Sequence, residues 1–382
     1  MYLEEREKLI RALNAESLDY IDVSDRAEPN LYKEIFPFDA PPKAVWDNIA
    51  IPMELPKEIW ITDTTFRDGQ QSRDPYTVDQ IVALYKYLNR IGGPRGRILM
   101  TEMFLYTQRD REAVQRARDL GLEYPRISGW IRASRDDLRT VREAKVEEVG
   151  MLASISDYHM FFKFKGLSRQ QIIEKYLDVI EEGLRSGICM RAHIEDCTRA
   201  DVLGVAVPFV RRLMKLSEKY RLPVKVRVPD TLGLGLPWPQ ASLPRSIPKL
   251  MWVLRHMGGV PSEWLEFHGH NDFHMCIANA TAAWMYGAAL NNTTLFGIGE
   301  RAGNTPLEAM VFEYAGLKGT LDGMDTCAIT DVANYYRKEI GYSIPPYYPI
   351  VGKNFNITRA GIHADGALKN IHAELVTQVE HL

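Results

Sequence analysis

Residues 264–272 read WLEFHGHND, and this stretch decides how the chain folds. A bulky apolar run ends in two histidines separated by a glycine, and a helical pattern follows over residues 271–287. Side chains alternate between the two faces of a strand, so His268 and His270 point the same way. Two imidazoles on one face, about 7 Å apart at the backbone, can bind one divalent cation. The stretch therefore predicts a strand, a metal-binding loop and a helix.

The same strand-then-helix pattern occurs eight times along the chain. Apolar runs that predict strands lie at residues 59–61, 98–100, 125–130, 146–152, 188–194, 224–228, 265–268 and 293–296. Helical patterns follow at residues 78–90, 108–120, 134–144, 168–186, 201–220, 247–257, 271–287 and 306–316. This alternation requires a parallel sheet, and eight units over about 260 residues indicate a closed (β/α)8 TIM barrel. An open, doubly wound sheet is the alternative, but no Gly-x-Gly-x-x-Gly motif follows the first strand.

We expect three parts in the chain. Residues 1–56 form an N-terminal extension with a short amphipathic helix and a proline-rich connection, and residues 57–320 form the catalytic barrel. Residues 321–382 form a short C-terminal subdomain, either truncated or naturally small.

Composition narrows the class of protein. With 382 residues, 46% of them hydrophobic, the chain can bury a large core. A net charge of −3 without a long basic block argues against nucleic acid as a partner. The four cysteines form no Cys-x-x-Cys pair, which predicts reduced thiols in a cytoplasmic protein. The N-terminus lacks a signal-peptide core, and no apolar stretch is long enough for a membrane span.

Polar residues at the carboxyl ends of the strands are the candidate site, because TIM-barrel chemistry is located there. Residues 63–71 read DTTFRDGQQ after the first strand, and Asp68 is predicted to join His268 and His270 as the third metal ligand. Two histidines and a carboxylate leave positions for substrate on a six-coordinate metal. Arg67 would offer a fixed cation to a developing oxyanion. Without this carboxylate, two hydrogen-bonded core histidines would be the simpler interpretation.

Strand five adds Arg191, His193 and Glu195 on one face. A buried arginine needs an anion, so Arg191 is predicted to bind the distal carboxylate of a substrate. The alternative for Arg191 is an internal Arg–Glu salt bridge. Other polar strand ends supply substrate-binding candidates and one further metal ligand: Glu102, His159, His193 and Thr231 for substrate, and Asn304 for metal.

Taken together, these residues resemble the DRE-TIM metallolyases, the superfamily of HMG-CoA lyase and of 2-isopropylmalate and homocitrate synthases. The motifs that carry the resemblance are DTTFRDGQQ at 63–71, HGHND at 268–272, GERAGNTPLE at 299–308 and GIHADG at 361–366. The resemblance implies a divalent metal, Mn²⁺ before Mg²⁺, Co²⁺ or Zn²⁺, on Asp68, His268 and His270 with Asn304 close by. It also implies that Arg67 polarises the substrate ketone, that Glu195 assists proton movement, and that the protein is a homodimer. In that dimer His363 would reach a neighbouring subunit's site as the base for the acetyl methyl group.

Within this superfamily, FPFDAPP at 36–42 and GGPRG at 92–96 are similar to the Re-citrate synthases. This similarity implies an acyltransferase that condenses acetyl-CoA with oxaloacetate to give citrate and CoA. The alternatives are 2-oxoisovalerate or 2-oxoglutarate as acceptor, a C–C lyase of the HMG-CoA lyase type, and a non-catalytic regulatory subunit. Two positions depart from the family pattern: His193 replaces a serine expected in homocitrate synthases, and Gln70 stands where glutamate is usual.

Overall fold

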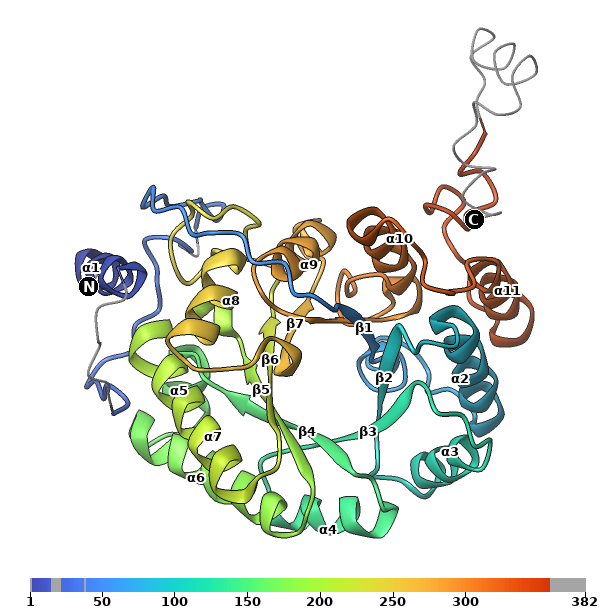
Figure 1. Cartoon of the computed structure of the whole chain (residues 1–382), viewed down its shortest axis with the longest axis horizontal. Coiled ribbons are helices and arrows are strands. Elements are labelled where there is room, and N and C mark those ends of the chain that lie inside the picture. Colours follow the sequence, from blue (N-terminus) through green and yellow to red (C-terminus); the bar gives the residue numbers. More distant parts are fainter. Residues whose placement is uncertain (1, 15–21, 38, 358–382) are drawn as a thin grey trace, which may run out of the picture.

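Eight parallel strands, paired in sequence order, close into a barrel in the computed structural model, which describes residues 2–14, 22–37 and 39–357. Figure 1 shows the strands as a central ring with the helices outside it. The strands are β1 Trp60–Asp63, β2 Ile98–Met103, β3 Arg126–Ile131, β4 Glu148–Ser154, β5 Cys189–Glu195, β6 Val224–Asp230, β7 Leu265–Gly269 and β8 Leu290–Thr293. The prediction of a (β/α)8 TIM barrel is confirmed.

Helices follow the strands as the alternation requires. Their bounds are α1 Tyr2–Leu13, α2 Val78–Gly92, α3 Gln108–Arg118, α4 Arg135–Ala144, α5 Asp157–Lys163, α6 Arg169–Arg185, α7 Val207–Tyr220, α8 Ile247–His256, α9 Cys276–Met285, α10 Leu307–Lys318 and α11 Cys327–Tyr335. Capping boxes at Thr77, Thr107 and Ser168 begin α2, α3 and α6. In each, the N-cap side chain accepts from the N3 backbone N–H, and the N-cap backbone N–H donates to the N3 side chain. These local signals explain why the helix starts were readable from the sequence.

The two faces of the strands differ in chemistry. On β5, Met190, Ala192 and Ile194 are fully buried in the apolar layer, while Arg191 and His193 between them turn into the barrel. Bulky aliphatic side chains fill the interior of most TIM barrels. In this chain much of the interior is charged, so its stability depends on how those charges are paired.

The N-terminal extension is tied to the connection between β6 and α8. The backbone N–H of Ser242 donates to Val45 O (2.8 Å), and that of Asp47 donates to Gln240 O (3.2 Å). Trp46 packs against Trp238 with ring centroids 5.6 Å apart. In Figure 1 the extension, in blue, runs from α1 along one side of the barrel to β1. It therefore forms part of the wall around the barrel end.

Two elements differ from the sequence prediction. The eighth strand is Leu290–Thr293 and not residues 293–296, because Asn291 and Asn292 bond inside the sheet layers and Phe296 adopts φ 56°, which extended backbone does not allow. The helix expected over residues 271–287 begins only at Cys276. His274, with φ 59°, lies in a loop that separates the metal-binding strand from that helix.

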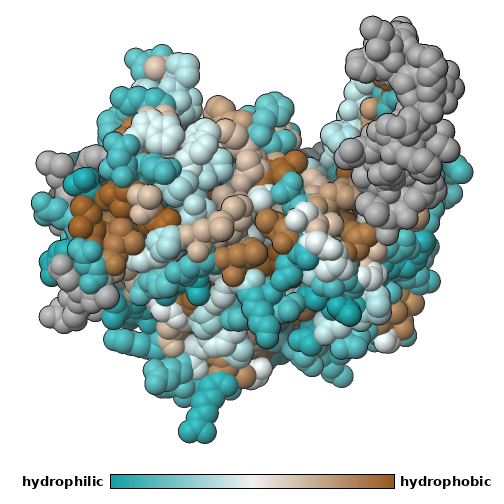
Figure 2. All heavy atoms as spheres, turned by 45° about the horizontal axis from the view of Figure 1, so that its top comes forward, coloured by the Kyte–Doolittle hydropathy of each residue, from teal (hydrophilic) through white to brown (hydrophobic). Residues whose placement is uncertain are grey.

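In the described ranges, no helix is both long and apolar enough to cross a membrane. Figure 2 shows a surface on which polar side chains predominate and apolar ones form separate patches.

Candidate active site

Asp68, His268 and His270 meet at the carboxyl end of the barrel as a three-ligand cluster. Asp68 begins a short 3-10 turn after β1, His268 is in β7, and His270 follows that strand. The two Nε2 atoms of the histidines are 3.2 Å apart, and Asp68 Oδ2 lies 3.4 Å from His268 Nε2 and 3.8 Å from His270 Nε2. One potential ligand atom from each residue lies within 4.8 Å of the others. This is the convergence that the spacing of the two histidines predicted.

The ionisation of the cluster suits a cation. Burial opposes the charge of Asp68, but Arg67 and the two histidines outweigh burial and hold the pKa of Asp68 well below its usual value. Burial, reinforced by His268, lowers the pKa of His270 to about 3. An ionised carboxylate and a neutral imidazole are the forms that coordinate metals.

Asn304 adds a fourth potential ligand to the cluster. Its Nδ2 donates to Asp68 Oδ2 at 2.5 Å, while its Oδ1 is buried without a hydrogen-bond partner among the described residues. A Cβ on Gly299 would lie 1.9 Å from that Oδ1, so only glycine leaves space for the amide. A buried acceptor without a donor, beside a carboxylate and two imidazoles, fits a bound divalent cation.

Asn292 orients His268 and was missing from the sequence prediction. Its Oδ1 lies 2.7 Å from His268 Nδ1, and its Nδ2 donates to Thr62 Oγ1 at 3.0 Å. With Nδ1–H donating to Asn292, the lone pair of Nε2 is directed at the cluster. The sequence held no usable signal for this residue, because its strand was placed three residues too late.

Arg67 lies beside the cluster and is held in place by two carboxylates. Its Nη1 donates to Asp68 Oδ1 (3.0 Å) and its Nε donates to Glu102 Oε2 (2.8 Å). The guanidinium carbon is 5.5 Å from the ring centroid of Trp130. Burial opposes the charge of Arg67, but Asp68 and Glu102 raise its pKa above the usual value. A fixed, permanent cation therefore adjoins the candidate metal site, and its role toward a substrate stays a prediction.

Glu102 and His193 lie beneath Arg67 and have almost no exposed surface. Glu102 also accepts from Arg227 Nη1 at 2.9 Å, and His193 Nε2 lies 3.3 Å from Glu102 Oε1 without hydrogen-bond alignment. A Cβ on Gly150 would lie 2.3 Å from His193 Nε2, so glycine is required where these side chains cross β4. Burial and the charge of Arg227 lower the pKa of His193 to about 3, which keeps it neutral. Glu102 therefore holds Arg67 directly, and His193 lies beside Glu102.

Arg191 lies deeper still. Its Nη1 donates to Glu266 Oε2 and its Nη2 to Glu148 Oε1, each at 2.5 Å, and the side chain is fully buried. These contacts support the internal salt bridge that was the alternative interpretation, with Glu148 and Glu266 as partners in place of Glu195. A substrate carboxylate could reach Arg191 only by displacing one of them, so we assign Arg191 to the interior.

Glu102, Glu148, Glu266, Lys225, Arg191 and Arg227 together form what we call the interior ion-pair network. Arg227 and Glu266 were not predicted to have a role. A signal existed for Glu266, because it stands two residues before His268 and must share its face of the strand. Burial opposes its charge, but Arg191 and Arg227 lower the pKa of Glu266 to about 2.

Glu195 and His159 lie together at the barrel mouth. Ser154 Oγ donates to Glu195, whose Oε2 is 3.5 Å from His159 Nδ1. The two side chains are 20% and 25% exposed, enough for a small ligand to reach both. Thr231 Oγ1 accepts from the backbone N–H of Asp196 at 2.9 Å, next to this pair. His363, the other predicted catalytic residue, lies outside the described residues.

Residues 58–335 match the family model described as HMGL-like. The chain belongs to the HMGL-like family. Its relatives include two proteins described as citrate (Re)-synthase. The protein from Syntrophus aciditrophicus is 50% identical over 362 residues, which cover 94% of this chain and 57% of that protein. The protein from Clostridium kluyveri is 50% identical over 354 residues, 93% of this chain and 78% of that protein. This HMGL-like chain thus spans little more than half the length of the Syntrophus relative.

Among solved structures, hydroxymethylglutaryl-CoA lyase from Pseudomonas aeruginosa matches with a TM-score of 0.58 and 19% sequence identity. The match covers 76% of this chain and 95% of the lyase. At this identity the similarity establishes a shared fold and no more.

Proposed function

We propose that this chain catalyses the condensation of acetyl-CoA with oxaloacetate and the hydrolysis of the product thioester, which releases citrate and CoA. The observation that carries the proposal is 50% identity to two citrate (Re)-synthases over more than nine-tenths of the chain. The cluster of Asp68, His268 and His270 supports it, because a 2-oxo acid needs an electrophilic centre at its ketone. A retro-aldol lyase is the second possibility, favoured only by the shared fold with HMG-CoA lyases.

Asp68, His268, His270 and the Oδ1 of Asn304 would hold a divalent cation, and we propose Mn²⁺ because the donors combine imidazoles with oxygens. When bound, the cation supplies Lewis acidity at the ketone oxygen. Reconstitution of metal-free protein with Mn²⁺, Mg²⁺, Co²⁺ and Zn²⁺ separately tests this choice. Higher activity with another ion would replace Mn²⁺ in the proposal.

Arg67 balances the negative charge that develops on the ketone oxygen during attack. No hydrogen bond in the described part of the chain uses its Nη2, which leaves that group for substrate while Nε and Nη1 are held. Held donors cost little reorganisation when charge develops, so they stabilise the transition state more than water does. At the mouth, Thr231 and His159 can donate to a carboxylate of the acceptor.

Glu195 or His363 removes a proton from the acetyl methyl group, and the resulting carbanion forms the new C–C bond to the ketone carbon. His159, 3.5 Å from Glu195, can exchange protons with it. Water then adds to the thioester carbonyl, and CoA leaves as the thiol. One acetyl-CoA, one oxaloacetate and one water thus give one citrate and one CoA.

The phosphates of acetyl-CoA also need a binding site, and a cavity of about 270 Å³ beside the mouth carries cationic side chains. It is lined by Arg132, Lys163 and Lys175, with Ser154 linking it to Glu195. Lysine ammonium groups bind phosphates as point charges. Charge reversal at Lys163 and Lys175 is expected to raise KM for acetyl-CoA and leave KM for oxaloacetate unchanged.

Thiol release with different acceptors tests the activity directly. Oxaloacetate, 2-oxoglutarate and 2-oxoisovalerate are each supplied with acetyl-CoA, with and without a chelator, and the product is identified by mass spectrometry. We expect thiol release with oxaloacetate that the chelator abolishes. Turnover of 2-oxoisovalerate or 2-oxoglutarate in place of oxaloacetate, or cleavage of an acyl-CoA substrate without condensation, would contradict the proposal.

We also propose that the protein is a homodimer in the cytoplasm. None of the four cysteines forms a disulfide, which is consistent with a reducing compartment. Light scattering gives the subunit number. Mixing a His363→Ala variant with an Asp68→Asn variant then tests whether His363 acts across the dimer, since mixed dimers would regain activity in one site.

A further inference from the structure

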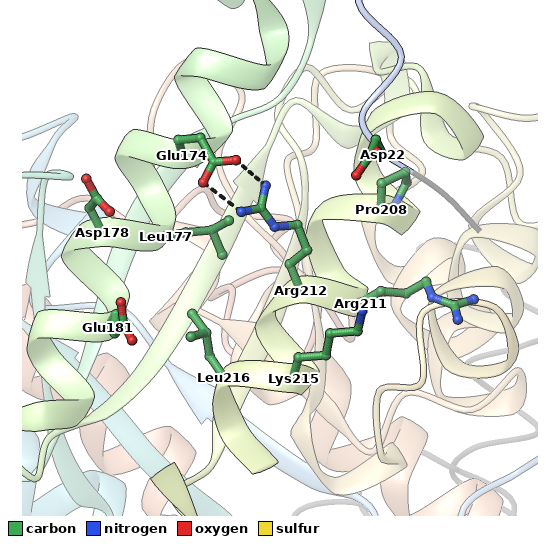
Figure 3. A pocket seen from close by; sticks show the side chains of 10 residues that line it. All are labelled: Asp22, Glu174, Leu177, Asp178, Glu181, Pro208, Arg211, Arg212, Lys215 and Leu216. Atoms are coloured by element: carbon green, nitrogen blue, oxygen red, sulfur yellow. Dashed lines mark hydrogen bonds and ion pairs between the residues drawn. The ribbon is translucent and has the colours of Figure 1, made fainter. Parts of the chain in front are cut away.

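Two cavities outside the barrel mouth differ in how their arginines are satisfied. The larger, about 340 Å³, is a groove between α6 and α7 (Figure 3). Arg212 crosses it, and both of its Nη atoms donate to Glu174 at 2.6 Å. The guanidinium of Arg212 is already paired with a carboxylate of the chain itself, so Arg212 does not need an anionic ligand.

The second cavity, about 260 Å³, has mostly apolar walls and two cationic side chains, Lys43 and Arg245, of which Arg245 has two nitrogens without a hydrogen-bond partner among the described residues. Its walls come from the N-terminal extension at Pro41, from the β6–α8 connection at Leu234 and Leu236, and from the loop after His270 at Phe273 and Met275. Backbone hydrogen bonds between residues 45–47 and 240–242 fasten two of these segments together. The cavity is therefore a built feature, slightly smaller than a typical ligand pocket of about 300–1,000 Å³.

Arg245 lines this cavity and is only 3% exposed. Its Nη1 makes a long bond of 3.4 Å to Leu234 O, and its guanidinium lies 5.4 Å from the ring centroid of Phe36. Its Nε and Nη2 are buried and have no hydrogen-bond partner among the described residues. Burial lowers the pKa of Arg245 to about 10, although the charge of Asp230 opposes this shift.

The neighbouring carboxylate, Asp230, makes no hydrogen bond to Arg245 among the described residues. Asp230 Oδ1 accepts from Thr198 Oγ1 (2.8 Å) and from the backbone N–H of Leu234 (2.9 Å), and its Oδ2 accepts from that of Gly235 (2.9 Å). These bonds shape the loop that forms the cavity wall.

Nε–H and one Nη2–H of arginine point in the same direction along one edge of the guanidinium, which matches the two oxygens of a carboxylate. Other arginines of this chain use that same edge for a carboxylate. Arg132 Nε and Nη2 donate to Asp137 (3.0 and 2.9 Å), and Arg199 Nε and Nη2 donate to Asp196 (2.9 and 2.7 Å). In Arg245 this edge is buried in the wall of the cavity and has no carboxylate partner among the described residues.

We infer that this cavity is a binding site for a small carboxylic acid with an aliphatic or aromatic body. The carboxylate would take the Nε/Nη2 edge of Arg245, and the apolar body would contact Pro41, Leu236, Phe273 and Met275. A buried guanidinium without a partner is unfavourable, so a ligand that pairs with it gains more than it would at an exposed arginine. The site lacks an acceptor for an amino group, which disfavours amino acids.

The site is distinct from the reaction centre and independent of the proposed activity. It lies behind the metal-binding loop: a Cβ on Gly233 would be 2.8 Å from His270 O and 2.9 Å from Asp272 N. Its test uses the full-length chain without acetyl-CoA or oxo acid, so failure of the citrate proposal would not affect it.

The experiment is calorimetric titration of the full-length protein with 3-methylbutanoate and with phenylacetate, alongside inorganic phosphate and CoA. We expect saturable binding of at least one acid, weakened roughly tenfold to a hundredfold by Arg245→Met. Phe273→Ala removes a half-exposed wall residue and should weaken binding less. Arg212→Met removes an arginine that is already paired and should change nothing.

Each outcome decides the inference. Loss of binding in Arg245→Met together with full binding in Arg212→Met supports the site. If Arg245→Met does not fold, weaker binding by Phe273→Ala serves as the supporting result instead. The inference is overturned if neither acid binds saturably to the unaltered protein. It is also overturned if phosphate or CoA alone binds in an Arg245-dependent way, since the ligand class would then be wrong.

Discussion

The metal cluster at the barrel mouth and the interior ion-pair network below it use the same kinds of side chain and are completed in different ways. In the network, Glu148 is met by Arg191 and Lys225, Glu266 by Arg191 and Arg227, and Glu102 by Arg227 and Arg67. In the cluster, by contrast, Asn304 Oδ1 has no partner in the described chain. Each carboxylate of the network is paired with a cation of the protein itself, although Arg227 Nη2 has no hydrogen-bond partner among the described residues. The cluster, in our proposal, would be completed by a metal cation.

This difference separates structural charge from functional charge. Buried ions are tolerated when every one is paired, which makes the network neutral and rigid. The cluster keeps the acceptor Asn304 Oδ1, which no donor among the described residues satisfies, and Arg67 connects the two regions through Asp68 and Glu102. Substitutions in the network should therefore affect stability, and substitutions in the cluster should affect metal binding and activity.

The largest effect is expected from Glu266→Gln. The change keeps the shape but removes the charge that Arg191 and Arg227 share, which should lower the free energy of unfolding by about 3–5 kcal/mol. Urea denaturation monitored by circular dichroism measures it. Glu174→Gln, which breaks the surface pair with Arg212, is the matched control and should change stability by less than about 1 kcal/mol. Equal effects of the two changes would refute the distinction.

Asp68→Asn changes the metal cluster instead of the network. It removes the charged ligand, so metal content should fall sharply and activity by more than about a hundredfold, while Glu102 still holds Arg67. Mass spectrometric metal analysis and the thiol-release assay measure these losses. Asp63→Asn changes another buried aspartate of the same strand end, one that bonds Thr65 and Thr101, and should keep its metal.

Asn292→Ala removes the contact between strand β8 and the imidazole of His268 in the cluster. Without the acceptor on Nδ1, the imidazole of His268 is free to rotate, and metal affinity should fall about 10–100-fold. Competition with a fluorescent chelator gives the affinity. Asn291→Ala, on the other face of the same strand, removes a bond to Ala280 O and should leave metal affinity unchanged. Similar losses in both variants would indicate a general effect on the strand.

The smallest effect concerns a buried acid outside both regions. Burial raises the pKa of Glu308 to about 7, although Tyr348 OH and the backbone N–H of Phe296 donate to its carboxyl group. An acid whose pKa is raised by folding stabilises fully below its unfolded pKa, and the contribution is lost as pH rises through the folded value. Stability should thus fall by on the order of 1–2 kcal/mol between about pH 5 and about pH 8 from this group. Glu308→Gln should flatten that slope in urea titrations.

Much of the barrel was readable from local pattern. Strand–helix alternation and capping residues are short-range signals, and they led to the closed barrel and to most element positions. Strand eight was misplaced because Asn291 and Asn292 look like turn residues, and only their partners on helix α9 and strand β1 show that they fit a strand. Likewise the helix after His270 begins late because a loop with a left-handed residue is inserted there.

The sequence by itself determined the candidate site residues that stand in motifs: Arg67 and Asp68 after the first strand, and His268 and His270 at the end of the seventh. Period-two spacing and strand-end position are properties of neighbouring residues, so they can be read without the fold. Tertiary structure alone decided which buried charges neutralise one another. Arg191 binds Glu148 and Glu266, and Arg245 binds no carboxylate, because pairing depends on distances between strands and loops that are far apart in sequence.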